Sequence, residues 1–466
     1  MSASRRRGGG GGAGGGNERR GRGRTRRRGG DELERPSSAE RLNSEEWPEP
    51  FLEALICQVA HEASQNIGRL EAAAAISNLF QVCSTWRAIS RSEHLWQTLT
   101  RHIWQCDHLV QHQTWREEYL FRHRTASNFH WGRAVYANIR LQVPGEEHDD
   151  NLICRRLALS DIHLACGLVD GSVRVFQLST RLHIATYHPQ PRDRLGHFSR
   201  AVSGIILLSN SNNRLVFASL DGDIHVAVID GGPATNRRVH LGNVVNDGTL
   251  LDFAGCCRWW VGLYAGVPRR SFHIWNAQTE QLVFVGGSLT DPESVMGWHL
   301  LNELNDSVGR VRMLSSSTSS TVVACTSLGL IFLDVRGDHE ITITSNEQAE
   351  RGVIVDSLDV NNTQRLFLVV DNRRVARICR VDDFQEVCRF RVRSGGLMLG
   401  CINSGCAFIW TGDGAGAVRA WDTRRGQLLY NLTDSMRDPT ALASDDRHVA
   451  VVTRDSTVHF WDFGVI

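Results

Sequence analysis

A short unit that recurs seven times after about residue 130 constrains the fold of this chain more than any other feature. Each unit is an apolar strand, a tight turn and a second strand, and apolar residues alternate along both strands, as in a half-buried sheet. The second strands align at Phe176, Ala227, Trp275, Leu333, Ile378, Trp421 and Trp461. Successive positions are 51, 48, 58, 45, 43 and 40 residues apart. The spacing predicts an array of repeated sheets.

A repeat of roughly 40 to 50 residues is typical of β-propeller blades, which bury their faces only by stacking in a closed ring. The fold class expected is therefore mainly β, a seven-bladed propeller over residues 130–466. The sequence ends at Ile466, just after the third strand of the last unit. We expect residues 133–143 to supply the missing fourth strand and so remove an exposed edge.

The turns within the units indicate tight hairpins. Asp170-Gly171, Asp221-Gly222 and Asp371-Asn372 supply residues that tolerate a positive φ. The second strands close with dipeptides that resemble the signature of WD repeats: Trp421-Asp422, Trp461-Asp462, Trp275-Asn276 and Leu333-Asp334. This resemblance spans about 330 residues, from 130 to 466.

Before the repeats, residues 44–125 carry apolar residues at helical spacing. Ser90 and Glu93 have the spacing of a capping box at the start of one of these helices. The order of motifs resembles an F-box: Trp47-Pro48, Phe51-Leu52, Leu55-Ile56, Val82-Cys83, Trp86-Arg87 and Leu95-Trp96. Trp47 stands where that pattern has leucine, and the alanines 72–75 lie within an insertion. The alternative is that these residues are the core of an unrelated helical bundle.

Residues 1–30 contain twelve Gly, ten Arg and one Glu, and after Met1 they contain no large apolar residue. Such a segment buries too little surface to offset its ordering entropy, so residues 1–35 are predicted to be a disordered tail. Its compact cluster Arg24, Arg26, Arg27 and Arg28 fits a nuclear import signal, a non-specific contact to nucleic acid or a solubilising role.

Lysine is absent, so all 52 basic residues are arginine. Two explanations stay open. Selection against side-chain amines would protect a protein that works beside activated ubiquitin, whereas a GC-rich genome would also favour Arg, Gly and Ala.

The tail, the F-box-like helices and the WD-like repeats together resemble the plant STERILE APETALA family. That resemblance implies a non-catalytic substrate receptor of a Skp–cullin–F-box ubiquitin ligase, acting in the nucleus, with a possible cytoplasmic pool, in floral and organ development. Its partners would be a Skp-type adaptor, through it a cullin, and a protein substrate such as a nuclear transcriptional repressor. The alternative is a nuclear transcriptional regulator that acts as a scaffold or contacts nucleic acid through the tail.

The resemblance to an F-box implies nine adaptor-contacting residues: Pro48, Phe51, Leu52, Leu55, Ile56, Val82, Trp86, Leu95 and Trp96. Five arginines fall in or beside the turns between paired strands and would favour an acidic substrate segment: Arg269, Arg270, Arg373, Arg374 and Arg454.

The sequence motifs favour no catalytic role, metal or cofactor. Without lysine a phosphate-binding P-loop is impossible, and no Gly-x-Ser-x-Gly motif is present. No apolar run reaches the roughly 20 residues of a membrane-spanning helix. The N-terminus does not resemble a signal peptide, so we expect an intracellular protein with no membrane partner.

Overall fold

The computed structural model describes residues 47–109, 112–142, 152–190, 200–208, 213–229, 232–287, 309–315, 320–326, 329–335, 355–392, 398–412, 416–433 and 435–465. Residues Glu49–Ile466 form one compact unit, so the helices and sheets are treated together. The predicted tail, with Arg24, Arg26, Arg27 and Arg28, lies outside the described residues. No helix in the described ranges is long and apolar enough to span a membrane.

The chain begins with a helical unit. Its helices are α1 (Glu49–Asn66), α2 (Arg69–Phe80), α3 (Ser84–Ile89), α4 (Glu93–Trp104) and α5 (Trp115–Trp131). Leu52, Ile56 and Ala60 line one side of α1 at a spacing of four residues and pack with α4 residues such as Leu95 and Leu99. The last helix continues past residue 125, where the sequence predicts the helical domain to end, and stops at Gly132.

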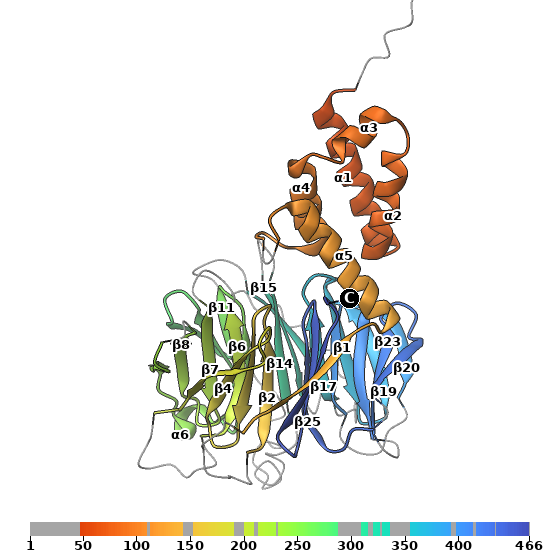
Figure 1. The fold of residues 1–466 in the computed structure, drawn as a ribbon. Coiled ribbons are helices and arrows are strands. Elements are labelled where there is room, and N and C mark those ends of the chain that lie inside the picture. The colour runs from red at the N-terminus through yellow and green to blue at the C-terminus, as the bar shows by residue number, and fades with distance from the viewer. Residues whose placement is uncertain are drawn as a thin grey trace, which may run out of the picture. The chain divides into compact units, whose positions relative to one another are not determined.

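Seven sheets follow, arranged around a ring (Figure 1). The first three are β2 (Cys154–Leu159), β3 (His163–Leu168), β4 (Val173–Gln177) and β5 (His183–Tyr187); β6 (Val202–Leu208), β7 (Arg214–Ser219), β8 (Ile224–Val228) and β9 (Asn236–His240); and β10 (Thr249–Gly255), β11 (Trp259–Ala265), β12 (Phe272–Asn276) and β13 (Leu282–Gly286). A short helix, α6 (Val244–Asp247), precedes β10.

The fourth sheet contains three strands among the described residues, namely β14 (Gly309–Ser315), β15 (Ser320–Thr326) and β16 (Gly329–Val335). The fifth and sixth are β17 (Val355–Asn361), β18 (Leu366–Asp371), β19 (Val375–Arg380) and β20 (Glu386–Arg391); and β21 (Gly400–Asn403), β22 (Cys406–Thr411), β23 (Ala417–Asp422) and β24 (Leu428–Thr433). The seventh joins β25 (Pro439–Ser444), β26 (His448–Thr453) and β27 (Thr457–Asp462) to β1 (Val135–Arg140).

The predicted seven-bladed propeller is confirmed. The first strands of neighbouring sheets contact one another in the order β2, β6, β10, β14, β17, β21 and β25, and β25 contacts β2 again, which closes the ring. All seven aligned residues lie in the third strand of their sheet, and six of them are buried. Apolar side chains of adjacent blades pack together, as Trp259 and Ile274 of the third blade do with Val322 and Leu333 of the fourth.

The ring is closed by a strand from the N-terminal side of the chain. β1 pairs antiparallel with β27, from Val135 opposite Asp462 to Arg140 opposite Thr457, and it lies within the segment 133–143 that the sequence singles out. Its buried residues Ala137 and Ile139 belong to the core shared by the first and last blades. The two ends of the propeller therefore share one sheet.

The turns between second and third strands follow the predicted chemistry with one difference. Gly171 and Gly222 have φ values of 92° and 86°, as the hairpins require. In the fifth blade the residue with positive φ is Arg374, at 64°, rather than Asn372. There the Asp371 carboxylate accepts hydrogen bonds from the backbone N–H groups of Arg373 and Val375, each at 3.0 Å. With the turn held in this way, the left-handed backbone conformation falls on Arg374, two residues after Asn372.

Two buried histidines make the stability of the propeller depend on pH. His225 on β8 stacks on Phe217, and His273 on β12 stacks on Tyr264. Burial lowers the pKa of each imidazole to about 4, against the smaller opposing effects of Asp223 and Asp247 respectively. In the unfolded chain the pKa returns to about 6.5. The unfolded state therefore binds more protons between these values, and stability falls as the pH drops below about 6.5.

We expect each histidine to cost about 1.2 kcal/mol of unfolding free energy on going from pH 7.0 to 5.5. Urea unfolding at the two pH values measures the loss. A variant with His225→Gln and His273→Gln should lose about 2.5 kcal/mol less than the unmodified chain over the same change. An equal loss in both proteins would show that other groups carry the pH dependence.

Candidate binding surfaces

The structure divides the nine predicted adaptor contacts into two groups. Leu52, Ile56, Leu95 and Trp96 are buried in the core of the helical unit. α1 and α4 pack against each other through these four residues in the unbound chain, and their contact with an adaptor stays a prediction. Their role in the structure is to support the surface residues from beneath.

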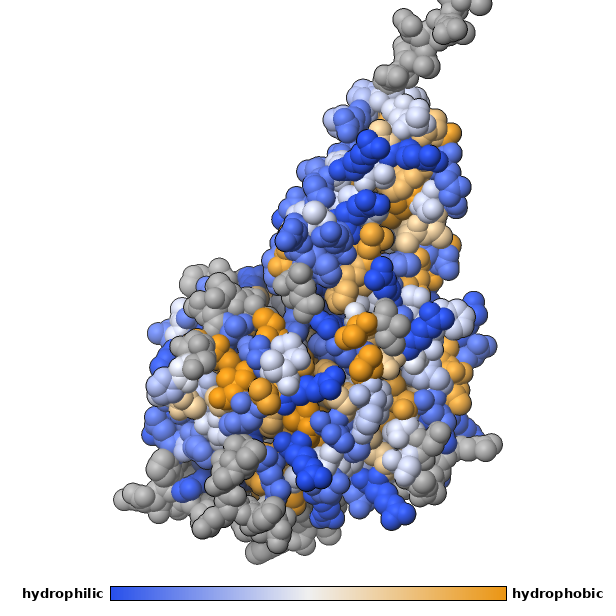
Figure 2. All heavy atoms as spheres, viewed as in Figure 1, coloured by the Kyte–Doolittle hydropathy of each residue, from blue (hydrophilic) through white to orange (hydrophobic). Residues whose placement is uncertain are grey.

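The remaining residues are accessible. Phe51 on α1 exposes 45% of its surface, and Val82, just before α3, exposes 64%. Leu55 and Trp86 are half-buried, and Pro48 is exposed just outside the compact unit. Phe51 and Leu55 are four residues apart and so share a side of α1 next to the buried one. Figure 2 shows hydrophobic residues among hydrophilic ones over the helical unit.

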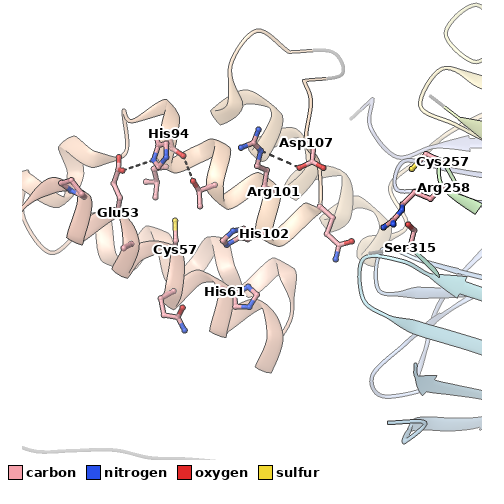
Figure 3. Close-up of a pocket in the computed structure, with 16 residues that line it drawn as sticks. Glu53, Cys57, His61, His94, Arg101, His102, Asp107, Cys257, Arg258 and Ser315 are labelled. Carbon is pink, nitrogen blue, oxygen red and sulfur yellow. Dashed lines mark hydrogen bonds and ion pairs between the residues drawn. The ribbon is translucent and has the colours of Figure 1, made fainter. Parts of the chain in front are cut away.

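A polar contact fixes α1 against the start of α4. The predicted capping box at Ser90 is wrong, because Ser90 ends α3 and its hydroxyl donates to the Arg87 carbonyl at 2.7 Å. The helix is capped by Ser92, whose Oγ accepts from the Leu95 N–H at 3.3 Å and donates to Glu53 of α1. The other oxygen of Glu53 lies 3.2 Å from His94 Nδ1 (Figure 3). Glu53 therefore holds the two helices in register.

A cleft of about 1120 Å³ runs along these helices and is lined by Glu53, Cys57, His61, His94 and Arg101, among others (Figure 3). Burial, with a contribution from Glu53, raises the pKa of the Cys57 thiol to about 11. A protonated thiol is a poor nucleophile and a poor metal ligand. No group of three or more potential metal ligands occurs among the residues that the structure describes.

The predicted substrate arginines lie in turns at one end of the blades. Arg269, Arg373, Arg374 and Arg454 are exposed, whereas Arg270 is half-buried and its Nη2 lies 2.6 Å from the Asp247 carboxylate. They occupy three different blades, in the turns between second and third strands. The structure thus brings them to one face without joining them into a single cluster.

The helical unit contacts the opposite face. Arg424, in the turn between β23 and β24, donates to the carbonyls of Asn66 and Ile67. Gln105, after α4, donates to the Thr363 carbonyl in the turn between β17 and β18 at 3.3 Å. In each sheet the turn between the second and third strands lies at one end. The turns that join the first strand to the second and the third strand to the fourth lie at the opposite end. The two candidate surfaces therefore face away from each other.

The central channel contains a charged network that the sequence analysis missed. Arg156 Nε lies 3.4 Å from Asp252 Oδ1, and Arg312 Nη1 lies 2.9 Å from Asp252 Oδ2. Arg312 Nε also lies 3.4 Å from Asp359 Oδ1. These residues come from the first strands of four blades. The signal available in the sequence is the presence of charged residues within the first strands β2, β10, β14 and β17.

Backbone groups complete the network. Asp252 accepts from the Val311 N–H at 3.0 Å, and Asp359 accepts from the Ile402 N–H at 2.9 Å. Burial raises the pKa of the Asp252 carboxyl, but Arg312 and Arg156 outweigh it and hold the pKa below its usual value. Asp252 is therefore ionised at neutral pH and links three blades.

These features define a WD-type seven-bladed propeller protein that carries an N-terminal helical unit. The chain is 47% identical over 437 residues to the transcriptional regulator STERILE APETALA of Arabidopsis thaliana, covering 92% of this chain and 95% of the relative. The chain belongs to the STERILE APETALA family.

Two further comparisons concern families and structures. No protein-family model matches the chain. Among solved structures, the β-propeller domain of Cps50 (Swd1) from Myceliophteria thermophila is similar, with 12% identity, a TM-score of 0.49, and coverage of 70% of this chain and 99% of that chain.

Proposed function

We propose that this protein is the substrate-receptor subunit of a Skp–cullin–F-box ubiquitin ligase and regulates floral and organ development from the nucleus. The helical unit would bind a Skp-type adaptor, and through it a cullin. The propeller would bind a protein substrate, such as a transcriptional repressor. Tethering raises the effective concentration of a substrate lysine near the activated ubiquitin, so the receptor itself needs no catalytic group.

The observation that carries the proposal is the exposure of Phe51 and Val82 above a well-packed helical core. Exposed apolar side chains that lie side by side on a folded unit are candidates for a surface that binds a protein partner. Phe51 is followed by Leu55 on the same side of α1, which is the pattern by which a helix binds in an apolar groove. The helical unit contacts the propeller face opposite the turn arginines, so both partners could bind at once.

A scaffolding role in transcription is the second candidate. It is favoured by the name of the Arabidopsis relative, a transcriptional regulator. Under this proposal the arginine cluster at residues 24–28 would direct nuclear import or contact nucleic acid, and the propeller would assemble protein partners without ubiquitin transfer. The two candidates differ in one respect, since only the ligase role requires a Skp-type adaptor.

We expect a variant with Phe51→Ser and Val82→Ser to bind a purified Skp-type adaptor at least about 30-fold more weakly, the loss typical of one buried interface hot spot. Both side chains are exposed, so the thermal midpoint should change little. Calorimetric titration measures the affinity. Leu182→Ser, at a propeller residue that is 65% exposed, is the matched control and should bind normally. If the unmodified chain has no affinity for the adaptor, the ligase role is excluded and scaffolding remains.

A further inference from the structure

We infer that the central channel of the propeller binds an anionic side chain, a carboxylate or a phosphate, carried by a peptide that docks on the face opposite the helical unit. The inference rests on the proposed function only in taking that peptide to be part of the substrate. Its basis is the geometry and charge of the first strands, which line a cavity of about 270 Å³ in the channel.

Among the side chains that the structure describes around the channel, arginines outnumber carboxylates. Asp252 interacts electrostatically with Arg155, Arg156, Arg310 and Arg312. Asp359 is the second carboxylate of this group. Among the described side chains, Arg155, Arg156 and Arg312 stand against Asp252 and Asp359, which leaves an excess of one positive charge. In a space of low dielectric such an excess attracts an anion more strongly than it would at an open surface.

Repulsion among the arginines also favours the binding of an anion in the channel. Burial, and after it the neighbouring Arg310, lowers the pKa of both Arg155 and Arg156. A group whose charged form is disfavoured in this way is stabilised when an opposite charge arrives. Arg156 exposes 17% of its side chain and Arg312 exposes 29%, so part of each side chain remains accessible.

Arg155 is the residue best placed to bind an incoming anion. It lies between Cys154 and Arg156, where the register of β2 against β3 shifts by one residue. It is half-buried, and no hydrogen bond or ion pair joins its side chain to another described residue. An arginine in this state can form a bidentate pair with a carboxylate or a phosphate.

The position of Arg155 also indicates the side from which the ligand enters. The Ile153 carbonyl, two residues earlier, accepts from the N–H of Val169, which belongs to the turn between β3 and β4. The start of β2 is thus at the same end of the propeller as the turns that carry Arg373, Arg374 and Arg454, and Arg454 belongs to the blade next to β2. A peptide lying across these turns could place one acidic side chain at Arg155.

The test measures the binding of three fluorescein-labelled peptides of one sequence to the full chain. They carry glutamate, phosphoserine or glutamine at the central position. We expect the two anionic peptides to bind, the glutamine peptide to bind at least about 10-fold more weakly, and inorganic phosphate to compete. The tighter of the two anionic peptides identifies the group that the channel prefers.

Two variants make the result specific to the channel. Arg155→Gln should weaken anionic binding by about 10-fold or more. Arg140→Gln, an equal charge change on the outer strand β1, should leave binding within twofold of the unmodified chain. Equal binding of all three peptides, or equal effects of the two variants, would overturn the inference. Adaptor affinity of the same samples is measured separately, so failure of the ligase role and failure of the anion site are distinguishable.

Discussion

Ala137→Pro is expected to destabilise the whole propeller, by at least about 3 kcal/mol. The Leu141 N–H donates to the Ser456 carbonyl at 2.9 Å, and hydrogen-bonded pairs alternate along an antiparallel ladder. Ala137, four residues before Leu141 and opposite Phe460, is therefore a hydrogen-bonded position. Proline removes its donor and disrupts the pairing of β1 with β27, which exposes a free strand edge at the point of closure.

The measurement is the free energy of unfolding in urea, together with the molecular size of the protein before unfolding. Ala137→Gly is the matched control, because it keeps the N–H and should cost no more than about 1 kcal/mol. Exposed edges of β27 and β1 also favour pairing with other chains, so the proline variant should aggregate at lower denaturant concentration. A proline variant as stable as the glycine variant would mean that the ring closes without this strand.

The blade pattern could be predicted from the sequence because it repeats. Each third strand places an apolar residue at the same register, as Phe176 opposite Leu164 and Trp461 opposite Val449 show. Seven copies of a weak pattern identify the fold although several copies, such as the one at Ala227, lack an aromatic residue. Along each strand the apolar residues recur at every second position, and this alternation specifies which residues face inward.

Periodicity does not reveal which of the apolar helical residues remain exposed. Leu52 and Phe51 are adjacent and similar in hydrophobicity, yet one is buried and the other is half-exposed. The difference depends on where α4 packs, which the sequence of α1 does not contain. The N-cap of α4 could not be predicted for the same reason. Ser90 and Ser92 are both suitable cap residues in the sequence, and only the folded chain brings Glu53 beside Ser92.

The channel network was missed for a related reason. Arg156 and Asp252 are far apart in the sequence and belong to different blades, so neither suggests a partner for the other. A charged residue in an apolar strand can be an edge residue, a ligand-binding residue or half of a buried pair. The ring geometry brings all first strands to one axis. Only this arrangement identifies the charged residues as parts of a buried pair.

The two candidate binding surfaces act together only if the helical unit keeps a fixed position on the propeller. The described structure places one side chain, Phe129 of α5, at the centre of that connection. It stacks on Phe463 with ring centroids 4.0 Å apart and meets the edge of Phe408 at 5.9 Å. The Tyr430 hydroxyl donates to the Phe129 carbonyl at 2.6 Å, and Asn128 Nδ2 donates to the Phe463 carbonyl at 2.8 Å.

Gly132 ends α5 where the chain turns into the closing strand. Its φ is 68°, and a Cβ at this position would come within 2.8 Å of the Tyr430 ring. Only glycine meets both conditions without strain. The helix end, the ring of Tyr430 and the start of β1 therefore form one packed joint, in which the position of the helical unit is tied to ring closure.

Phe129→Ala is expected to cost about 3–5 kcal/mol of unfolding free energy, as for other fully buried phenylalanines. It should also loosen the joint, so that trypsin cleaves more rapidly after the exposed Arg133 between α5 and β1. Urea unfolding and limited proteolysis measure the two effects. Both depend on Phe129 filling the space between Phe408 and Phe463.

Trp131→Ala is the control, since Trp131 lies in the same turn of α5 and is 66% exposed. It should change stability by no more than about 0.5 kcal/mol and leave cleavage after Arg133 unchanged. If Phe129→Ala lowered stability without faster cleavage, the core would be affected but the joint would not depend on this ring. Under the proposed ligase role, slower ubiquitin transfer by Phe129→Ala with adaptor and substrate still bound would show that the fixed position of the helical unit contributes to the transfer.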